Sequence, residues 1–269
     1  MEAPPRIQLD GSPGRSRRPI LIAVGVALLA VIAVGGYGLW YLFLQPAGPA
    51  AVADTSLPPV PTSASGSPQP TASQPAASSQ AGGSGGIDGT WKVDTSIGSF
   101  ADSTSSFVGY RVQEQLASIG ANTAVGRTPD VSGSLTISGT QVTAATMTAD
   151  LTTLQSDDQR RDGQLARQGI QTGQFPTATF ALTSPIDLGS VPADGQEIQV
   201  TATGKLTLHG QSKDVQIPLR ARLTGSTIAV SGLLPIVFAD YGIEKPNSFM
   251  ILTIADSGTM ELQLFFTRA

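Results

Sequence analysis

Apolar and polar residues alternate with a period of two along the chain from residue 89 onward, most clearly in the stretch 197–223. In its first arm, 198–209, apolar side chains occupy 198, 200, 202, 206 and 208; in its second arm they occupy 215, 217, 219, 221 and 223. This period predicts extended strands with one face out of water. A short connection containing Gly210 predicts a hairpin between the arms. A single hairpin is not stable alone, so partner strands must cover the same apolar face.

The same alternation predicts further strands on both sides of this hairpin. They fall at 90–94, 106–113, 131–138, 141–154, 178–182, 228–234, 250–254 and 260–266. Most show one apolar face, and their turn spacing is that of an all-β chain. We therefore predict one antiparallel sheet that curls into an eight-stranded β-barrel, a size that is either filled by side chains or holds one small ligand.

One helix interrupts the strands, at 156–169. Ser156 has the chemistry of an N-cap, and Gln159 stands three residues later, as in a capping box. Asp157 and Asp158 suit the positive end of the helix, and Gly169 can end it. The sequence thus predicts an all-β barrel with one short helix.

The N-terminal part of the chain has a different pattern. Residues 20–44 are uncharged and apolar, long enough to span a bilayer and longer than the core of a typical cleaved signal. Four arginines precede this stretch, and no Lys or Arg follows it until Lys92. The positive-inside rule then predicts a cytoplasmic tail (1–19), a single-pass transmembrane helix (20–44) in the cell membrane and an extracytoplasmic C-terminal domain. The alternative is a cleaved signal, which the small residues at 51–53 would suit.

Residues 45–88 join this stretch to the barrel. They are rich in Pro, Ser, Ala, Thr and Gly and show no apolar periodicity. Such a composition cannot bury enough apolar surface to fold, so we predict a disordered linker. The barrel domain is predicted at 89–269.

The composition limits the kinds of partner and metal site that the protein can have. Residues 89–269 contain 12 Lys+Arg and 16 Asp+Glu, and this mild negative charge predicts no nucleic-acid partner. The chain has no cysteine and one histidine, which excludes thiolate and multi-histidine metal sites within one chain. We accordingly predict no metal and no cofactor.

Two groups of polar residues could carry chemistry. His209 could act as a general base, but its place beside Gly210 is typical of a turn residue, and no serine is placed beside it as a triad would require. The charged helix residues around Arg161 and Asp162 could hold a ligand head group or a metal ion. The simpler interpretation is a capped, solvated helix in which these two residues tie the helix to the barrel.

Several blocks of the sequence resemble the YceI-like family of extracytoplasmic, lipocalin-like barrels. They are Trp-Lys-Val-Asp at 91–94, Arg-Asp-Gly-Gln-Leu at 161–165, Phe-Pro-Thr-Ala-Thr-Phe at 175–180, Gly-Lys-Leu-Thr-Leu-His-Gly at 204–210 and Asp-Tyr-Gly-Ile at 240–243. The blocks follow the family's order. The sequence departs from the family at Gln164, where a histidine is usual, and at 118–130, which differ from the family's charged loop.

The resemblance implies a binding protein, and not an enzyme, for a long apolar or amphiphilic ligand such as a polyisoprenoid, an isoprenoid quinone or a fatty-acyl lipid. Two alternatives stay open: a closed-core module of the cell envelope, or an enzyme acting on a lipid or quinone. We expect no catalytic residue. The alternation and the resemblance together place the following side chains in the barrel lumen: Val108, Tyr110, Met147, Phe180, Leu182, Val200, Leu206, Leu208, Ile217, Leu219, Val230, Leu252, Leu262 and Leu264.

Overall fold

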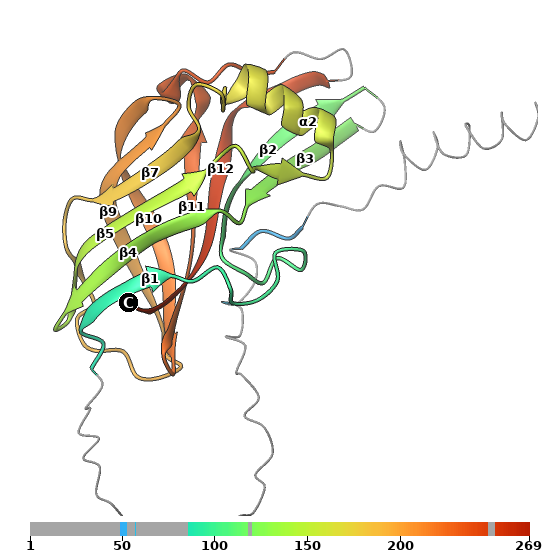
Figure 1. The fold of residues 1–269 in the computed structure, drawn as a ribbon. Helices are drawn as coiled ribbons and strands as arrows, with labels where there is room; N and C mark the ends of the chain where they lie inside the picture. Colours follow the sequence, from blue (N-terminus) through green and yellow to red (C-terminus); the bar gives the residue numbers. More distant parts are fainter. Residues whose placement is uncertain (1–48, 53–56, 58–85, 118–119, 247–250) are drawn as a thin grey trace, which may run out of the picture. The chain divides into compact units, whose positions relative to one another are not determined.

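The computed structural model describes residues 49–52, 57, 86–117, 120–246 and 251–269 (Figure 1). The predicted cytoplasmic tail (1–19) and transmembrane helix (20–44) lie outside these residues. Within the described ranges, no helix combines the length and the apolar character that crossing a bilayer requires.

The strands are β1 (Gly89–Val93), β2 (Phe107–Leu116), β3 (Gly120–Thr128), β4 (Val131–Ser138), β5 (Gln141–Asp150), β6 (Gln155–Ser156), β7 (Thr177–Leu182), β8 (Ile186–Asp187), β9 (Glu197–Leu208), β10 (Gln211–Thr224), β11 (Thr227–Val237) and β12 (Ile251–Arg268). The helical segments are α2 (Gln159–Gln164), a π-helix η1 (Leu165–Gly169) and a 3-10 helix η2 (Phe238–Tyr241).

Eight of these strands close into an antiparallel barrel. They follow the order β1, β4, β5, β7, β9, β10, β11 and β12, and pairing between β12 and β1 completes the ring. Closure leaves no unpaired edge in the ring. The predicted eight-stranded, all-β barrel with one short helix is confirmed.

The last strand, β12, pairs with β11 along one edge and, because it is long, with two strands in turn along the other. Its final residues, from Phe266 to Arg268, pair with β1, whereas the part from Ile251 to Gln263 pairs with β2. Strands β2, β3 and β6 therefore leave the ring and form an extension beside it. Figure 1 shows this extension with α2 across its end. The extension adds wall to one end of the barrel.

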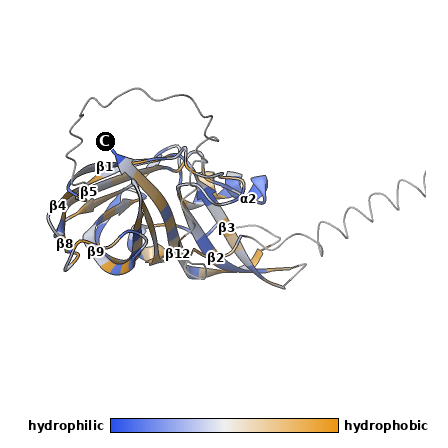
Figure 2. Ribbon diagram, turned by 90° about the horizontal axis from the view of Figure 1, so that it is seen from below, coloured by the Kyte–Doolittle hydropathy of each residue, from blue (hydrophilic) through white to orange (hydrophobic). Residues whose placement is uncertain are grey.

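The helix begins later than predicted. Ser156 belongs to β6, and its backbone N–H and hydroxyl both donate to the Asp162 carboxylate. Asp158 is the N-cap instead, accepting a hydrogen bond from the Arg160 backbone N–H at 2.8 Å. None of the residues of α2 is buried, and Figure 2 shows the helix as mostly hydrophilic. The helix is therefore held by polar contacts and not by an apolar face.

Strand β3 is not among the strands that the alternation predicts. Its sequence mixes glycine, asparagine and threonine with few large apolar residues, which gives no clear alternation. It pairs with β2 from Val108 to Leu116. Long-range pairing, and not local propensity, makes this segment a strand.

Packed residues extend to the N-terminal side of the predicted domain boundary. Ile87 is buried, and its carbonyl accepts a hydrogen bond from the Trp91 indole N–H at 3.0 Å. The described residues of the predicted linker also include Val52 and Leu57, which are 7% and 3% exposed. These two side chains pack against the outer wall of the barrel.

Candidate functional site

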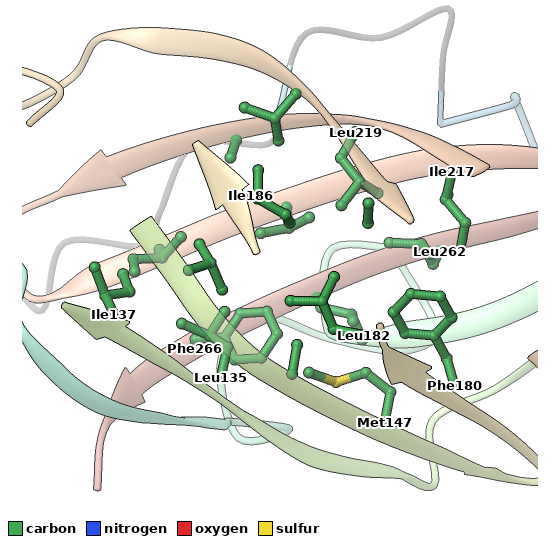
Figure 3. A pocket seen from close by; sticks show the side chains of 18 of the residues that line it. Leu135, Ile137, Met147, Phe180, Leu182, Ile186, Ile217, Leu219, Leu262 and Phe266 are labelled. Carbon is green, nitrogen blue, oxygen red and sulfur yellow. The ribbon is translucent and has the colours of Figure 1, made fainter. Parts of the chain in front are cut away.

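An apolar cavity of about 170 Å³ lies inside the barrel. Strands β4, β5, β7, β9, β10, β11 and β12 all contribute side chains to its wall. Figure 3 shows Leu135, Met147, Phe180, Leu219 and Leu262 pointing into a common space from different strands. The alternation along each strand produces this wall, because every second side chain faces the interior.

The predicted lumen residues are almost all found at the interior. Those that line the first cavity are Val108, Met147, Phe180, Leu182, Val200, Leu206, Ile217, Leu219, Val230, Leu262 and Leu264. Tyr110 and Leu208 line a second cavity, and Leu252 lines neither.

The prediction of a lumen position for Leu252 is wrong. This side chain is 62% exposed, whereas Ile251 and Ile254 line the second cavity. The pairing of β12 with β2 shifts register between Ile251 and Thr253, and again between Ile254 and Gly258. The first irregularity adds one residue on β12 and so exchanges the inward and outward faces of the strand, whereas the second adds two and keeps them. Strict alternation therefore fails in the first part of β12.

The second cavity, of about 160 Å³, lies between the barrel end and the β2–β3 extension. Residues of α2, η1 and the connection from Phe238 to Pro246 complete its wall. Val108, Ala178 and Met260 border both cavities. The two spaces are therefore neighbours that share these three side chains.

A polar cluster stands at the helix side of the second cavity. Arg161 donates to the Glu114 carboxylate at 3.0 Å and also pairs with Asp157. Asn122 donates to the same Glu114 oxygen at 2.7 Å. Burial alone would lower the pKa of Arg161, but the carboxylates of Glu114 and Asp157 outweigh it, so this pKa is raised. The arginine is a permanent cation already held by two anions.

The Tyr110 hydroxyl takes no part in the hydrogen bonds of this cluster. Its oxygen is buried, and none of the residues that the structure describes shares a hydrogen bond with it. Burial raises the pKa of Tyr110; nearby Arg161 opposes the rise, and Asp162, Glu114 and Asp157 add to it. The phenol therefore stays protonated and presents a hydrogen-bond donor beside the cavity.

The two charged helix residues singled out by the sequence have different places. Arg161 lines the second cavity. Asp162 instead accepts from the Ser156 backbone N–H at 3.0 Å and from its hydroxyl at 2.6 Å. Asp162 thus fastens α2 to β6, as the helix-anchor interpretation expects, while Arg161 stands where a ligand head group could reach.

His209 occupies the β9–β10 turn but is buried, with 8% of its surface exposed. Its Nδ1 lies 2.9 Å from the Tyr241 carbonyl, which can only accept, so Nδ1 carries the proton. The ring packs against Phe175 with centroids 4.4 Å apart. Its Nε2 has no hydrogen-bond partner among the described residues. The histidine holds η2 against the turn.

Parts of the wall were not foreseen. Ile186 and Leu188 reach the first cavity from the short strand β8 and its end, and Ile243 reaches the second from an irregular connection. Two-residue strands and connections have no periodicity to detect. Leu135 and Ile137, in contrast, lie on the alternating strand β4 and could have been found from their spacing.

The walls of the two cavities are mostly apolar, and the polar groups lie at one end, around Tyr110 and Arg161. Within the described ranges, no group of three or more His, Asp or Glu side chains could hold a metal ion. The arrangement is therefore suited to burying an apolar molecule with its polar end near Tyr110.

Comparison with known proteins places the chain in a family. Residues 99–266 match the YceI-like domain, so the chain belongs to the YceI-like family. A polyisoprenoid-binding domain from Saccharophagus degradans, implicated in plant cell wall breakdown, is 20% identical, with a TM-score of 0.52 over 66% of this chain and 98% of that one. BcnA from Burkholderia cenocepacia is 22% identical, with a TM-score of 0.46 over 59% and 95% of the two chains. No curated protein matches the sequence.

Proposed function

We propose that this YceI-like protein binds a long apolar or amphiphilic molecule inside its barrel and holds it without chemical change. The observation that carries the proposal is the pair of neighbouring apolar cavities that share Val108, Ala178 and Met260. Ligand sites are concave, mostly apolar and supplied with a few placed polar groups. The two cavities and the cluster around Tyr110 have this character.

The size of the cavities favours an extended ligand over a compact one. Each has about the volume of an engineered protein cavity of ~150 Å³ that binds benzene. One cavity alone therefore has room for a small apolar group, and a chain that passes the shared residues would occupy both. Each buried methylene contributes about 0.8 kcal/mol. Apolar area alone can thus bind a polyisoprenoid, an isoprenoid quinone or a fatty-acyl lipid.

Family membership supports the same ligand class. The domain from Saccharophagus degradans with a TM-score of 0.52 is described as polyisoprenoid-binding. The likeness of the two structures concerns the fold, and the cavities of the present chain supply the argument for binding. In this arrangement the apolar chain fills the barrel and its polar end lies near Tyr110 and Arg161.

The proposed setting is the outer face of a cell membrane. The uncharged stretch 20–44 and the arginines before it support an anchor with a cytoplasmic N-terminus. A ligand that is insoluble in water would then be taken from, or returned to, the membrane beside which the barrel is held. Protease added to intact cells should cut the barrel free within the linker.

The shared residue Ala178 gives the sharpest test. Ala178→Leu should occupy the space between the cavities and weaken binding of a fluorescent prenyl probe at least tenfold, while the apo protein keeps its stability. Ala181→Leu is the matched control, because Ala181 lies on the same strand with an exposed side chain. Native mass spectrometry of the protein from its own membranes should show a bound lipid. No bound lipid and no probe binding by the wild type would overturn the proposal.

A further inference from the structure

Three arginines, two on the β2–β3 extension and one on the barrel ring, hold the backbone of a segment far away in sequence. Arg111 on β2 donates to the Pro49 carbonyl, and Arg127 on β3 donates to the Ala50 carbonyl at 3.0 Å. Arg222 on β10 donates to the Leu57 carbonyl at 2.8 Å. Donors from three strands thus converge on the described residues 49–52 and Leu57, hereafter the strap.

Two apolar side chains anchor the same segment. Val52, 7% exposed, lines a hollow of about 600 Å³ whose other walls come from the outer faces of β9, β10 and β11. Leu57, 3% exposed, packs with Ala229 on β11, Phe265 on β12 and Ile97. The arginines bind backbone carbonyls, which every residue has, so these hydrogen bonds do not select a particular sequence. Val52 and Leu57 therefore give the contact its sequence specificity.

A buried glutamate orients two of these arginines, Arg111 and Arg127, toward the strap. Glu261 on β12 is fully buried and accepts from the Arg111 Nε at 2.9 Å and from the Arg127 Nε at 2.7 Å. Because Glu261 takes one nitrogen of each guanidinium, another nitrogen of each is free to meet a strap carbonyl. Burying three charges is costly unless their remaining hydrogen-bonding groups are satisfied. The carbonyls of Pro49 and Ala50 meet part of this need.

The strap contributes to a burial pattern that a simple barrel would not have. Residues 261–266 of β12 are buried on both faces of the strand, although an eight-stranded ring normally exposes its outer face. The even-numbered residues face the cavity, and the odd-numbered Glu261, Gln263 and Phe265 are covered from outside. Leu57 covers Phe265, and the Gln263 amide donates to the carbonyls of Ser103 and Ser105.

We propose that residues 49–52 and Leu57 form an intramolecular docking strap, held by Arg111 and Arg127 of the extension and Arg222 of the ring and anchored by Val52 and Leu57. Only residues 45–48 then separate the apolar stretch 20–44 from the docked chain. Four extended residues reach at most about 14 Å, whereas a free linker over 45–88 would reach roughly 35–40 Å.

The effect on the membrane rests on the proposed anchor, but docking of the strap does not. If residues 20–44 are in a bilayer, the docked strap keeps the barrel close to that bilayer. The short connection would favour passage of an insoluble ligand between membrane and barrel. The two statements therefore need separate measurements.

Docking is tested by electron paramagnetic resonance on the full chain, which has no native cysteine. Spin labels at Ala50→Cys and Thr146→Cys use two exposed positions, one on the strap and one on β5. The distance between the labels should show one narrow distribution. Adding Val52→Asp and Leu57→Asp should broaden it several-fold, and Val60→Asp, in the same linker beyond the strap, should leave it narrow.

A broad distribution in the labelled parent protein would overturn the docking strap. So would a narrow distance that disappears when labelled protein is diluted with unlabelled protein, because the strap would then lie on a second copy. Denaturant unfolding of the Val52→Asp/Leu57→Asp variant should remain cooperative, which shows that the barrel is intact when the strap is released.

Membrane distance is measured by energy transfer from a donor at Thr146→Cys to an acceptor lipid in phosphatidylcholine vesicles. Release of the strap should reduce the transfer, and Val60→Asp should not. Equal transfer in all three proteins would overturn the membrane role of the strap. A full chain that does not float with vesicles would overturn the anchor, while the spin-label distances would still decide whether the strap docks.

Discussion

Tyr110 and Gly126 lie directly opposite each other on β2 and β3, and the phenol ring occupies the space that a side chain at 126 would need. A Cβ at Gly126 would stand 2.4 Å from a ring carbon of Tyr110. The absence of a side chain on β3 therefore sets the position of the Tyr110 hydroxyl beside the second cavity. The glycine matters here for the close approach and not for an unusual backbone angle.

Gly126→Ala should displace the Tyr110 ring and lower the free energy of unfolding by about 1–3 kcal/mol, the usual cost of overpacking. Binding of a prenyl probe with a polar head should weaken in parallel with Tyr110→Phe, which removes only the hydroxyl. Gly173→Ala is the control, since an added Cβ there meets open space. Unchanged stability and binding in Gly126→Ala would contradict the assigned contact.

Leu206→Ala separates a hollow barrel from a filled one. Leu206 is 3% exposed and lines the first cavity. In a filled core the change would cost ~2–5 kcal/mol. Since Leu206 borders existing space, it has fewer contacts to lose, so we expect about 2 kcal/mol or less by denaturant titration of the apo protein, with a larger effect on probe affinity. A loss near 5 kcal/mol together with no probe binding would indicate a solid core.

The buried ion pairs of Glu261 should matter far more than an exposed pair. Glu261→Gln leaves Arg111 and Arg127 without their shared counter-charge, and we expect a loss of about 3–5 kcal/mol in the free energy of unfolding. Asp214→Asn breaks the exposed pair with Lys205 and should change it by about 0–1 kcal/mol. Similar losses in the two variants would show that Glu261 is not desolvated as described.

Asp94 should make stability depend on acidic pH. Hydrogen bonds from the Ser96 hydroxyl lower the pKa of Asp94 against the opposing effect of burial, and the Ser96 backbone N–H and Thr267 lower it further. A lowered pKa in the folded state gives stability that is present above the unfolded value of about 3.9 and is lost as pH falls through the folded value.

Asp94→Asn should therefore be less stable than the wild type at pH 7, and the difference should shrink below about pH 4. Unfolding curves measured from pH 7 to pH 2 test this expectation. Asp102→Asn, at an exposed position in the following loop, is the control. A difference that stays constant over this range would mean that ionisation of Asp94 is not involved.

The β9–β10 hairpin is the element that the local sequence predicted in most detail. Its alternation predicted the inward face, and the strands pair in register from Leu208 opposite Gln211 to Glu197 opposite Arg222. The turn itself is the two residues His209 and Gly210, with φ of 50° and 72°. Such two-residue turns favour glycine because positive φ is strained for other residues. Here the pattern and the turn chemistry agree.

Helix α2 and strand β12 show features that the local sequence does not predict. Ser156 has the right chemistry for an N-cap, yet the Asp162 carboxylate takes its N–H and hydroxyl, and Asp158 caps the helix. In β12 the register irregularity between Ile251 and Thr253 turns Leu252 outward. Both outcomes depend on partners distant from the local pattern.

The sequence by itself determined which face of most strands is apolar and that the folded domain is all-β, because alternation is a local property and each strand carries it alone. Only the tertiary structure decided that β1 and β12 close the ring and that the interior contains two neighbouring cavities. It also decided that the Tyr110 hydroxyl has no hydrogen-bond partner among the described residues, and that Val52 and Leu57 lie on the outer wall. Empty volume and the partner of a polar group depend on side chains brought together from many strands, and no periodicity along one strand reports how well those side chains fill the space between them.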